Sequence, residues 1–467
     1  MTTSVVWLRR DLRLRDNPAL LTAAEEAGRD EVCVAVVLDQ ALLAGSDRRA
    51  ARYLASLRAL DADLDGALTV LAGPPEHALP ALAREVGAGT VHVSRESTPY
   101  GRGRDERVGS ALAGAGVGLR ATGTPYAVGP GSVRTGGGTP YKVFTPFSRA
   151  WREHGWARPA GPPEGRWLRA ESGTSLPDSA WLESALPETT RSGSAASGSA
   201  GERAAYERWR RFLDEDLEGY AGDRNRPDLD TTSRMSVPLK YGEIHPRTML
   251  ADLLAHDLWG GEDVDRFVTE LCWREFYADV LWHRPDSAWH DWSDSLRGMA
   301  YADPDDPDVA ADIEAWRQGR TGFPVVDAGM RQLATEGWMH NRVRMITASF
   351  LVKDLHVWWP VGARHFLEHL LDGDIASNNH GWQWVAGTGT DASPYFRVFN
   401  PVTQGIRFDP RGEYVRRWVP ELAHLGGKAA HEPWKAPDGY AHGYPQRIVD
   451  HGVERERALS RYEATRG

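Results

Sequence analysis

The stretch from Ser4 to Leu38, SVVWLRRDLRLRDNPALLTAAEEAGRDEVCVAVVL, sets the pattern for the first part of the chain. Apolar runs at Ser4–Leu8 and Val32–Leu38 flank the pair Asn17-Pro18, a capping side chain followed by proline at the first helical position. Continuous Val/Leu strands joined through a helix are typical of a parallel sheet that is covered on both faces. We therefore predict that the chain opens as an α/β domain.

The same alternation of apolar runs and helical patterns continues to about residue 125. It predicts a doubly wound parallel sheet of five strands, and such sheets bind ligands outside the carboxyl ends of their strands. The glycine-rich stretch GAGVG at Gly114–Gly118 follows a helix instead of a strand, so it does not qualify as a dinucleotide loop. The expected strands are Ser4–Leu8, Val32–Leu38, Leu68–Ala72, Thr90–Ser94 and Gly118–Thr122, and the later helices lie at about 47–64, 76–86 and 101–113.

Composition divides the chain into three parts. Gly, Ser, Pro and Ala dominate between Gly155 and Gly201, where little apolar surface is available for burial, so we predict a connection that runs over the surface. Beyond Glu202, apolar and aromatic residues recur at spacings of three and four, which predicts an all-helical domain. The expected domains are an α/β domain over residues 1–130, a linker over 131–201 and an all-α domain over 202–467.

The whole chain has an ordinary globular composition, with 467 residues, 41% of them hydrophobic and 26% charged. Cys33 and Cys272 both lie in apolar segments, so we expect two buried thiols and a reducing cytoplasm. No apolar run approaches about 18 residues, so we expect no membrane span. The net charge of −10 argues against a protein that coats nucleic acid non-specifically, but it allows a local basic face.

Motifs of hydrolases and phosphate-binding loops are absent: the sequence contains no HExxH, GxSxG, CxxC or P-loop. His365 and His369 share a helix face at a spacing of four, which alone is a weak metal signal. Since the pattern shows no acidic or cysteine partner for them, we expect no metal.

Tryptophans, carboxylates and side-chain amides are concentrated in the stretch from Leu371 to Asn400, LDGDIASNNHGWQWVAGTGTDASPYFRVFN. Asp372 and Asp374 flank a glycine, and Trp382 and Trp384 flank a glutamine. Exposed tryptophans are poorly compensated in water, and buried carboxylates and amides must find partners. The mixture indicates a pocket for a large, flat ligand with polar edges.

Three other segments carry suitable chemistry for such a ligand. ELCWREFY places Glu270, Trp273 and Arg274 on one side of a helix, where an internal ion pair is the simpler interpretation. Four basic residues oppose one glutamate between Arg331 and Lys353, which predicts a local positive patch that approaches phosphates. The hydroxyl-rich TSRMS segment suits a pyrophosphate. Together these features match a flavin dinucleotide, with tryptophans left to stack on bases taken out of a duplex.

These motifs carry a resemblance over nearly the whole chain. VVWLRRDLRLRDN, TSRMS, ELCWREFY, TGFPVVDAGMRQL, GWMHNRVRM and DGDIASNNHGWQWVAGTGTDASPYFRVFNP are similar, in order, to motifs of the DNA photolyase/cryptochrome family. The resemblance implies an N-terminal antenna domain and a C-terminal helical domain that holds FAD in a U-shaped conformation. Within the family the chain most resembles class I cyclobutane pyrimidine dimer photolyases of the deazaflavin-antenna type.

The resemblance also implies a set of residues for reduced FAD. Asn378 would face the flavin N5, where a neutral amide is compatible with the reduced anionic ring. Plant cryptochromes carry an aspartate at this position, so the asparagine favours repair. The implied FAD contacts are Tyr220, Thr232, Ser233, Arg234, Met235, Ser236, Arg274, Asn341, Arg344, Asp372, Gly373, Asp374 and Asn378.

The substrate follows from the same comparison. Photolyases for (6-4) lesions carry histidines where this chain has Asn341 and Met345, so the resemblance implies light-driven splitting of cyclobutane pyrimidine dimers in UV-damaged DNA. An electron from excited reduced FAD would reach a flipped-out dimer; the alternative is a blue-light cryptochrome that signals without repair. The catalytic candidates are Glu270, Asn341, Arg342 and Asn378, and the candidate DNA contacts are Arg224, Glu270, Trp273, Asn341, Arg342, Met345, Trp384, Arg397 and Gln404.

The antenna and the photoreduction relay are further implications of the resemblance. Glu96, Thr98 and Lys240 lie in segments similar to 8-hydroxy-5-deazaflavin binders, and methenyltetrahydrofolate is the alternative antenna. Trp382 and Trp359 match the first two tryptophans of the family's relay. The third position holds Asp306, which leaves Tyr301, Trp292 or Trp338 as the terminal relay. We expect a monomer.

Overall fold

The computed structural model describes residues 3–28, 31–176 and 200–465. Contacts divide the chain into two compact units. The first unit comprises residues 1–218 and 233–285, and the second comprises residues 219–232 and 286–467. These boundaries differ from the predicted domains, whose division by function stays a prediction. The serine-rich end of the predicted linker lies mostly outside the described residues.

The first unit contains the predicted parallel sheet. Its strands are β1 (Ser4–Trp7), β2 (Glu31–Leu38), β3 (Thr69–Ala72), β4 (Thr90–Val93) and β5 (Gly118–Ala121), in the order β3-β2-β1-β4-β5. Val5 pairs with Cys33 on one side and with Val91 on the other, so β1 lies at the centre of the sheet. The predicted α/β fold is confirmed, because long Val/Leu runs have few alternatives to a buried strand.

A sixth strand, β6 (Arg166–Leu168), was missed by the sequence prediction. It pairs in parallel with Glu31–Cys33 of β2, next to the part of β2 that pairs with β3. Three residues in a segment rich in Gly and Pro give no usable periodicity, so this strand depends on its partner and not on a local pattern.

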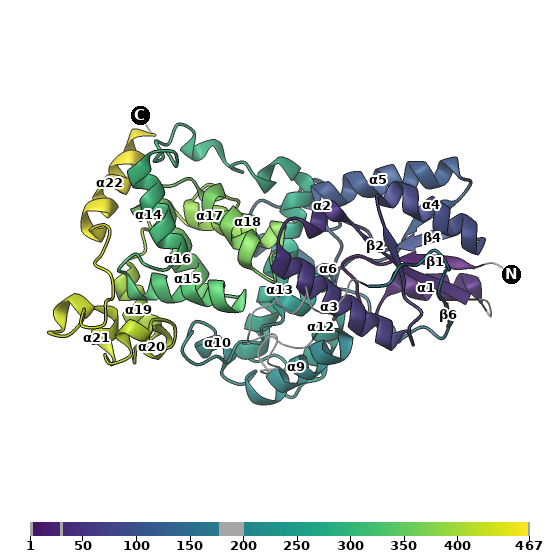
Figure 1. The fold of residues 1–467 in the computed structure, drawn as a ribbon, viewed down its shortest axis with the longest axis horizontal. Coiled ribbons are helices and arrows are strands. Elements are labelled where there is room, and N and C mark those ends of the chain that lie inside the picture. Colours follow the sequence, from purple (N-terminus) through teal and green to yellow (C-terminus); the bar gives the residue numbers. More distant parts are fainter. Residues whose placement is uncertain (1–2, 29–30, 177–199, 466–467) are drawn as a thin grey trace. The chain divides into compact units, whose positions relative to one another are not determined.

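Helices cover both faces of this sheet. Figure 1 shows α1 (Pro18–Ala27) and α3 (Asp47–Asp63) on one side, and α4 (Pro75–Val86) and α5 (Pro99–Gly114) on the other. A short helix, α2 (Gln40–Leu43), follows β2. The predicted cap of α1 is present, since the Asn17 side chain accepts a hydrogen bond from the Leu20 amide at 3.2 Å.

Part of the predicted linker is a packed helix. α6 (Phe144–His154) contacts α13 (Glu262–His283), and Phe147 and Trp151 are buried. The Trp151 indole donates to Glu275 at 2.7 Å. The predicted surface connection, between Gly155 and Gly201, begins after α6, but the linker range of 131–201 did not anticipate this packed helix. Glycine and proline on either side concealed its aromatic spacing of three and four.

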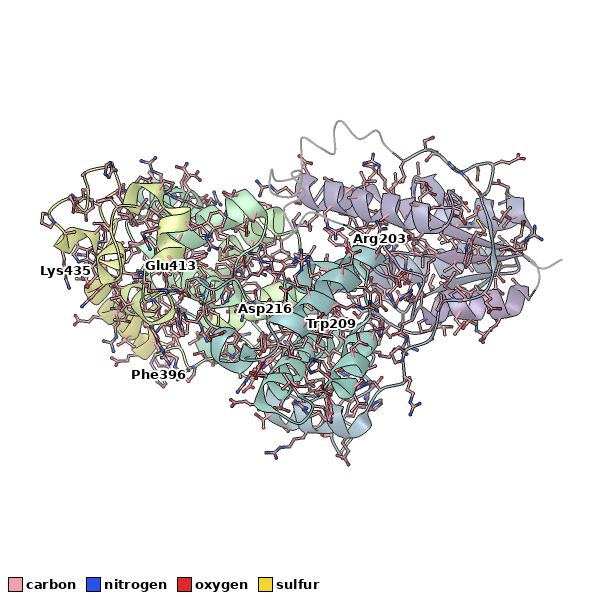
Figure 2. All side chains as sticks on the ribbon, turned by 90° about the horizontal axis from the view of Figure 1, so that it is seen from below. Arg203, Trp209, Asp216, Phe396, Glu413 and Lys435 are labelled. Atoms are coloured by element: carbon pink, nitrogen blue, oxygen red, sulfur yellow. The ribbon has the colours of Figure 1, made fainter. Side chains whose placement is uncertain are left out.

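The first unit also holds four described helices from beyond the predicted linker: α13, α9 (Glu202–Glu215), α11 (Ser236–Tyr241) and α12 (Pro246–Ala255). Trp209 on α9 is fully buried, and its indole donates to Asp252 at 2.8 Å (Figure 2). Both cysteines are buried free thiols, as predicted, and burial raises the pKa of Cys33 to about 11 and that of Cys272 to about 12.

The second unit is helical, as predicted: every regular element described between residues 286 and 465 is a helix. Its core combines aliphatic side chains with large aromatic ones, among them Trp316, Trp359 and Trp382. Among the described residues, no helix is long and apolar enough to cross a membrane. The main helices are α10 (Tyr220–Asp223), α14 (Pro307–Arg317), α15 (Pro324–Glu336), α16 (Asn341–Ser349), α17 (Trp359–His369), α18 (Ile375–Ala386), α19 (Pro401–Phe408), α20 (Glu413–Trp418), α21 (Lys428–His431) and α22 (His451–Ala464).

Candidate functional site

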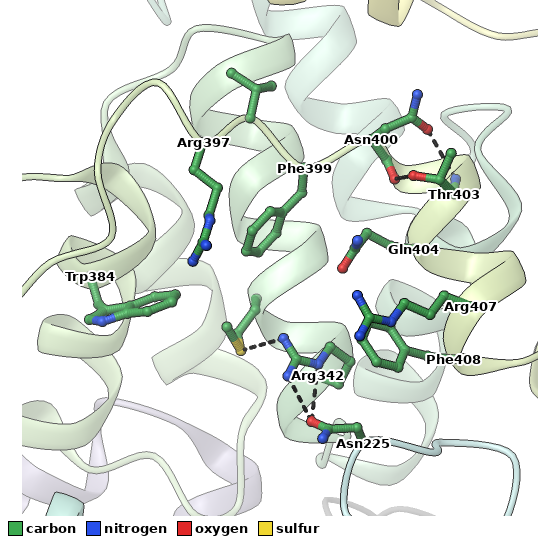
Figure 3. Close-up of a pocket in the computed structure, with 12 residues that line it drawn as sticks. Asn225, Arg342, Trp384, Arg397, Phe399, Asn400, Thr403, Gln404, Arg407 and Phe408 are labelled. Carbon is green, nitrogen blue, oxygen red and sulfur yellow. Dashed lines mark hydrogen bonds between the residues drawn. The ribbon is translucent and has the colours of Figure 1, made fainter.

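The second unit contains a cavity of about 580 Å³, which we call the α16–α19 pocket (Figure 3). This volume lies within the usual range for a small-molecule site. Its walls are formed by α16, α18, α19, the loop before α19 and Asn225. The lining residues are Asn225, Arg342, Met345, Trp384, Arg397, Val398, Phe399, Asn400, Thr403, Gln404, Arg407 and Phe408.

Local helix signals position the two walls of the pocket. α16 begins where the His340 ring accepts a hydrogen bond from the Arg342 amide at 3.2 Å, which places Arg342 and Met345 one turn apart on one face. α19 begins with Asn400 as its cap, which accepts from the Thr403 amide at 3.0 Å, followed by proline at the first helical position. Both walls therefore rest on helix starts that are encoded in the sequence.

The pocket combines cations with aromatic faces. The Arg342 guanidinium donates to the Asn225 side-chain oxygen at 2.7 and 3.2 Å and lies 4.7 Å from the centre of the Phe408 ring. Arg407 lies 5.1 Å from the same ring. The lining holds three arginines, with Arg397, and no carboxylate. Figure 3 shows Trp384 across the cavity from α19. Such a site favours a flat, anionic ligand.

Five of the predicted DNA contacts meet in this pocket: Arg342, Met345, Trp384, Arg397 and Gln404. Of the others in this unit, Arg224 follows α10 next to Asn225, and Asn341 is the exposed first residue of α16. The sequence reasoning missed seven lining residues. On α19, a helical spacing of three and four residues could have indicated Thr403, Arg407 and Phe408. The missed residues are Asn225, Val398, Phe399, Asn400, Thr403, Arg407 and Phe408.

The positive patch predicted between Arg331 and Lys353 does not exist as such. Arg331 pairs with Glu421 at 2.6 Å, and Arg344 pairs with Asp372 at 2.8 Å. Lys353 is buried and donates to the Arg397 carbonyl at 3.0 Å. A local count of charges missed these partners, because they lie far away in the sequence. Of the four predicted basic residues, Arg342 alone lines the pocket, and the other two cations of the lining, Arg397 and Arg407, come from separate segments.

Two of the predicted flavin residues of the second unit, the half-buried Arg344 and the buried Asp372, form an ion pair at 2.8 Å. Asp372 accepts from Arg344 through Oδ2, and its buried Oδ1 has no hydrogen-bond partner among the described residues. Asp374 caps α18 by accepting from the Ser377 amide at 3.0 Å. The Thr232 hydroxyl is likewise buried without a partner in the described part of the chain. Orphaned buried polar atoms of this kind are rare unless a ligand satisfies them.

Asn378 has a fixed orientation. Its side-chain nitrogen donates to the Ala363 carbonyl at 3.1 Å and to the Asn379 side chain at 2.8 Å. Both amide hydrogens are therefore used within the protein, and the Asn378 oxygen is left as an acceptor. Gly373 lies buried between the two aspartates, and Tyr220 is buried at the start of α10.

The predicted flavin residues of the first unit lie at the start of α11 and on α13. Arg274 donates to the carbonyls of Pro125 and Leu239, at 3.0 and 3.3 Å. Ser233, Arg234, Met235 and Ser236 form the entry into α11, where the Ser233 hydroxyl accepts from the Met235 amide at 3.4 Å.

Glu270 and Trp273 also lie on α13, and both are half-buried. The Trp273 ring stacks on Phe144, with centroids 3.6 Å apart and planes 5° from parallel. One face of this indole is therefore already covered within its own unit.

Comparisons with known proteins agree with this architecture. Residues 267–464 match the family described as the FAD binding domain of DNA photolyase, and residues 4–164 match the family DNA photolyase. A deoxyribodipyrimidine photo-lyase from Streptomyces griseus is 41% identical and covered completely, as is this chain. The chain belongs to the DNA photolyase family.

Two further relatives support this membership. The deoxyribodipyrimidine photo-lyase of Escherichia coli K12 is 39% identical over 100% of this chain and 99% of its own length. The crystal structure of a bacterial class III photolyase from Agrobacterium tumefaciens is 37% identical, with a TM-score of 0.90 over 100% of this chain and 98% of that chain. The predicted family is confirmed, whereas the predicted class I, deazaflavin subtype stays a prediction.

The predicted relay residues Trp382 and Trp359 lie in the core of the second unit. Trp382 is buried and meets Phe366 and Trp316 edge-on, at centroid distances of 5.0 and 6.1 Å. The buried Trp359 indole donates to Asp291 at 2.7 Å.

The third relay position has a structural role. Asp306 caps α14 by accepting from the Asp308 amide at 2.9 Å, so this position is part of a helix start. Tyr301, Trp292 and Trp338 stay predictions as terminal relays. Burial raises the pKa of Tyr301 well above its usual value, which makes loss of its proton costly.

The predicted antenna residues lie in the first unit. Glu96 is buried, accepts from the Ser97 and Thr98 amides at 2.8 and 3.2 Å, and lies 3.6 Å from Arg10. Burial would raise the pKa of Glu96, but nearby arginines outweigh this effect and lower it. The Thr98 hydroxyl caps α5 by accepting from the Gly101 amide at 3.2 Å. Lys240 lies on α11, half-buried.

Proposed function

We propose that this photolyase repairs DNA by splitting cyclobutane pyrimidine dimers in light, and that the α16–α19 pocket receives the flipped-out dimer. The observation that carries this proposal is the convergence of five predicted DNA contacts on one acid-free pocket. The full-length relatives named deoxyribodipyrimidine photo-lyase support the same activity.

The chemistry of the pocket matches the demands of a flipped dimer. Stacking of a base on an aromatic side chain contributes about 1–3 kcal/mol, and Trp384 offers a half-buried ring at the wall of the cavity. Arg342 is held by Asn225 before any ligand binds, which reduces the entropic cost of recognition. The exposed Arg397 and Arg407 are suited to the phosphates beside the lesion.

The residues of this chain fit an FAD cofactor. In its reduced form, bound FAD supplies the electron that opens the dimer under light. The orphaned oxygen of Asp372 and the orphaned hydroxyl of Thr232 offer polar partners to such a ligand. The oriented oxygen of Asn378 suits a donor N–H at the flavin N5. We assign the remaining predicted FAD residues to the same cofactor.

The catalytic roles concern position and not acid–base chemistry. We propose that Glu270 hydrogen-bonds pyrimidine edges and that Asn341 and Arg342 orient the lesion at the start of α16. No general base is required, in agreement with the absence of hydrolytic motifs in the sequence.

For the antenna we propose 8-hydroxy-5-deazaflavin, with methenyltetrahydrofolate as the alternative, on the resemblance of the segments around Glu96, Thr98 and Lys240. The absorption spectrum of the chromophore released from purified protein distinguishes them. A released folate would overturn the deazaflavin assignment.

The test of repair is the loss of dimers from oligothymidine that contains them, incubated with reduced protein in light and in the dark. We expect loss only in light. Persistence of the dimers in light, with FAD bound and reduced, would overturn the repair proposal and favour a light-sensing role.

A further inference from the structure

The last turn of α17 carries a cluster outside both the pocket and the relay. One ligand atom each from His365, Glu368 and His369 lies within 4.8 Å of the others. His365 is buried, His369 is half-buried and Glu368 is exposed, so the cluster opens to solvent at one side. We propose that these three side chains form a binding site for a divalent transition metal ion, with Zn²⁺ as the preferred ion.

This proposal reverses the prediction of no metal. The sequence reasoning counted the two histidines but overlooked Glu368, which directly precedes His369. The spacing is H-x-x-E-H, which places all three side chains on one helix face. The same spacing occurs in a class of zinc enzymes, for the same geometrical reason.

His369 is oriented as a ligand. Its Nδ1 donates to the His365 carbonyl at 2.9 Å, which fixes the tautomer and leaves Nε2 with its lone pair. Metal-binding histidines typically make this arrangement, in which the second ring nitrogen donates to a backbone carbonyl or a carboxylate.

His365 is held close to His369. The two ring centroids are 4.2 Å apart, and the buried His365 ring packs at 5.4 Å from Trp316. This packing restricts the orientation of the His365 ring beside the other two side chains.

The surrounding charges also favour a cation. The cluster lies at the C-terminal end of α17, where the helix dipole and the last carbonyls are negative. Glu368 contributes a carboxylate group to the cluster. Arg317 opposes the cation, but its charge is offset by Glu314 at 3.6 Å. Arg364 is engaged with the Trp289 ring, 5.0 Å away.

The ligand set points to a particular class of ion. Two imidazoles and one carboxylate suit Zn²⁺, Co²⁺, Ni²⁺ or Cu²⁺, whereas Mg²⁺ and Ca²⁺ prefer oxygen ligands. Three protein ligands leave a coordination position for water.

The ion would clamp the last turn of the helix that supports the relay. Trp359 begins α17, and a Cβ on its Gly362 would lie 2.1 Å from Trp382, so this helix touches the Trp382 ring. The proposed function is therefore structural, and it does not depend on repair.

The experiment uses untagged, full-length protein with its native flavin, freed of metal by a chelator and titrated with Zn²⁺ in a calorimeter. We expect one ion per chain. His369→Ala should abolish binding, and Glu368→Gln should weaken it by more than about tenfold. The matched control is His442→Ala, because His442 lies 4.6 Å from His424 in a second histidine pair. This control should leave binding unchanged.

A second readout locates the ion in variants that stay folded. With Zn²⁺ present, hydrogen exchange should slow at the Leu370 amide, which bonds to the Phe366 carbonyl at 2.8 Å, and His369→Gln should remove this protection. Absence of stoichiometric binding would overturn the proposal. Binding that survives both His365→Ala and His369→Gln, or that is lost in His442→Ala alone, would also overturn it.

Discussion

The α16–α19 pocket and the segment from Glu96 to Thr98 were both predicted to bind ligands, and their side chains are used in opposite ways. In the pocket, Trp384 and Gln404 face an open cavity. In the other segment, Glu96 accepts from two backbone amides and Thr98 caps α5. Motif residues therefore line an open cavity in one unit, whereas in the other unit their polar groups accept hydrogen bonds mainly from the local backbone.

The difference shows what a motif match leaves undetermined. A polar residue in a motif serves either a ligand or the local backbone, and both uses constrain the residue type. Only the geometry distinguishes them, through atoms that have no protein partner, such as Asp372 Oδ1. Single substitutions separate the two uses, because one lowers ligand binding and the other lowers stability.

Asp372→Ala should have the largest effect, because Asp372 both pairs with Arg344 and is proposed to bind FAD. Removing one partner of a largely buried pair costs about 3 kcal/mol of unfolding free energy, and we expect loss of bound flavin as well. Urea unfolding and the flavin-to-protein absorbance ratio measure both effects. The control is Asp294→Ala in the exposed pair with Arg297, where we expect less than about 1 kcal/mol.

Trp384→Ala should weaken binding of dimer-containing DNA by about 1–3 kcal/mol through lost stacking, with little change for undamaged DNA. We expect a loss in the same range for Trp273→Ala, since Phe144 covers only one face of that ring. Fluorescence anisotropy in the dark gives both affinities. Unchanged affinity for damaged DNA in the Trp384 variant would contradict the stacking role in the pocket.

Lys353 beneath the rim of the pocket should make stability depend on pH. Burial lowers the pKa of this lysine from 10.5 to about 7. Between these values the unfolded chain binds more protons than the folded protein, so stability rises with pH across this window. From pH 7 to pH 8 the gain should be about 1 kcal/mol, and Lys353→Met should lack it. An equal pH dependence in both proteins, measured by urea unfolding, would contradict the buried amine.

Thr98→Ala should lower the unfolding free energy by about 1 kcal/mol, because α5 loses its cap. Thr98→Ser keeps a capping hydroxyl and should stay near wild-type stability. Chromophore content is measured in the same samples. Loss of the antenna without loss of stability in Thr98→Ala would show that the hydroxyl serves the ligand more than the helix.

The smallest effect is expected for Arg397→Gln, an exposed residue at the rim of the pocket. A phosphate contact should lower the slope of log affinity against log salt by about one, for damaged and undamaged DNA alike. Arg297→Gln, on an exposed arginine outside the pocket lining, is the control and should keep the wild-type slope. An unchanged slope in Arg397→Gln would remove this residue from the DNA face.

The sequence predicted the sheet well and the pocket in part, for physical reasons. All five predicted strands agree with the structure within one residue at each end. Apolar runs leave few alternatives for β1 to β4, whereas β5 is short and largely exposed and lies at the sheet edge beside β4. β6 and α6 were missed since their stability comes from partners elsewhere in the chain. Ion pairing was least predictable: the partner of Arg331 is Glu421, 90 positions away, and no local pattern announces it.

The proposed role of the α16–α19 pocket rests on discrimination between damaged and intact DNA. The measurement is dark binding of a duplex with one cyclobutane dimer and of the same duplex without it, for the wild-type protein and for Gln404→Trp, which fills the cavity. We predict that the wild-type protein prefers the damaged duplex and that the variant binds both duplexes with the affinity of the intact one. A preference that survives filling of the cavity would contradict the assignment of the dimer to this pocket.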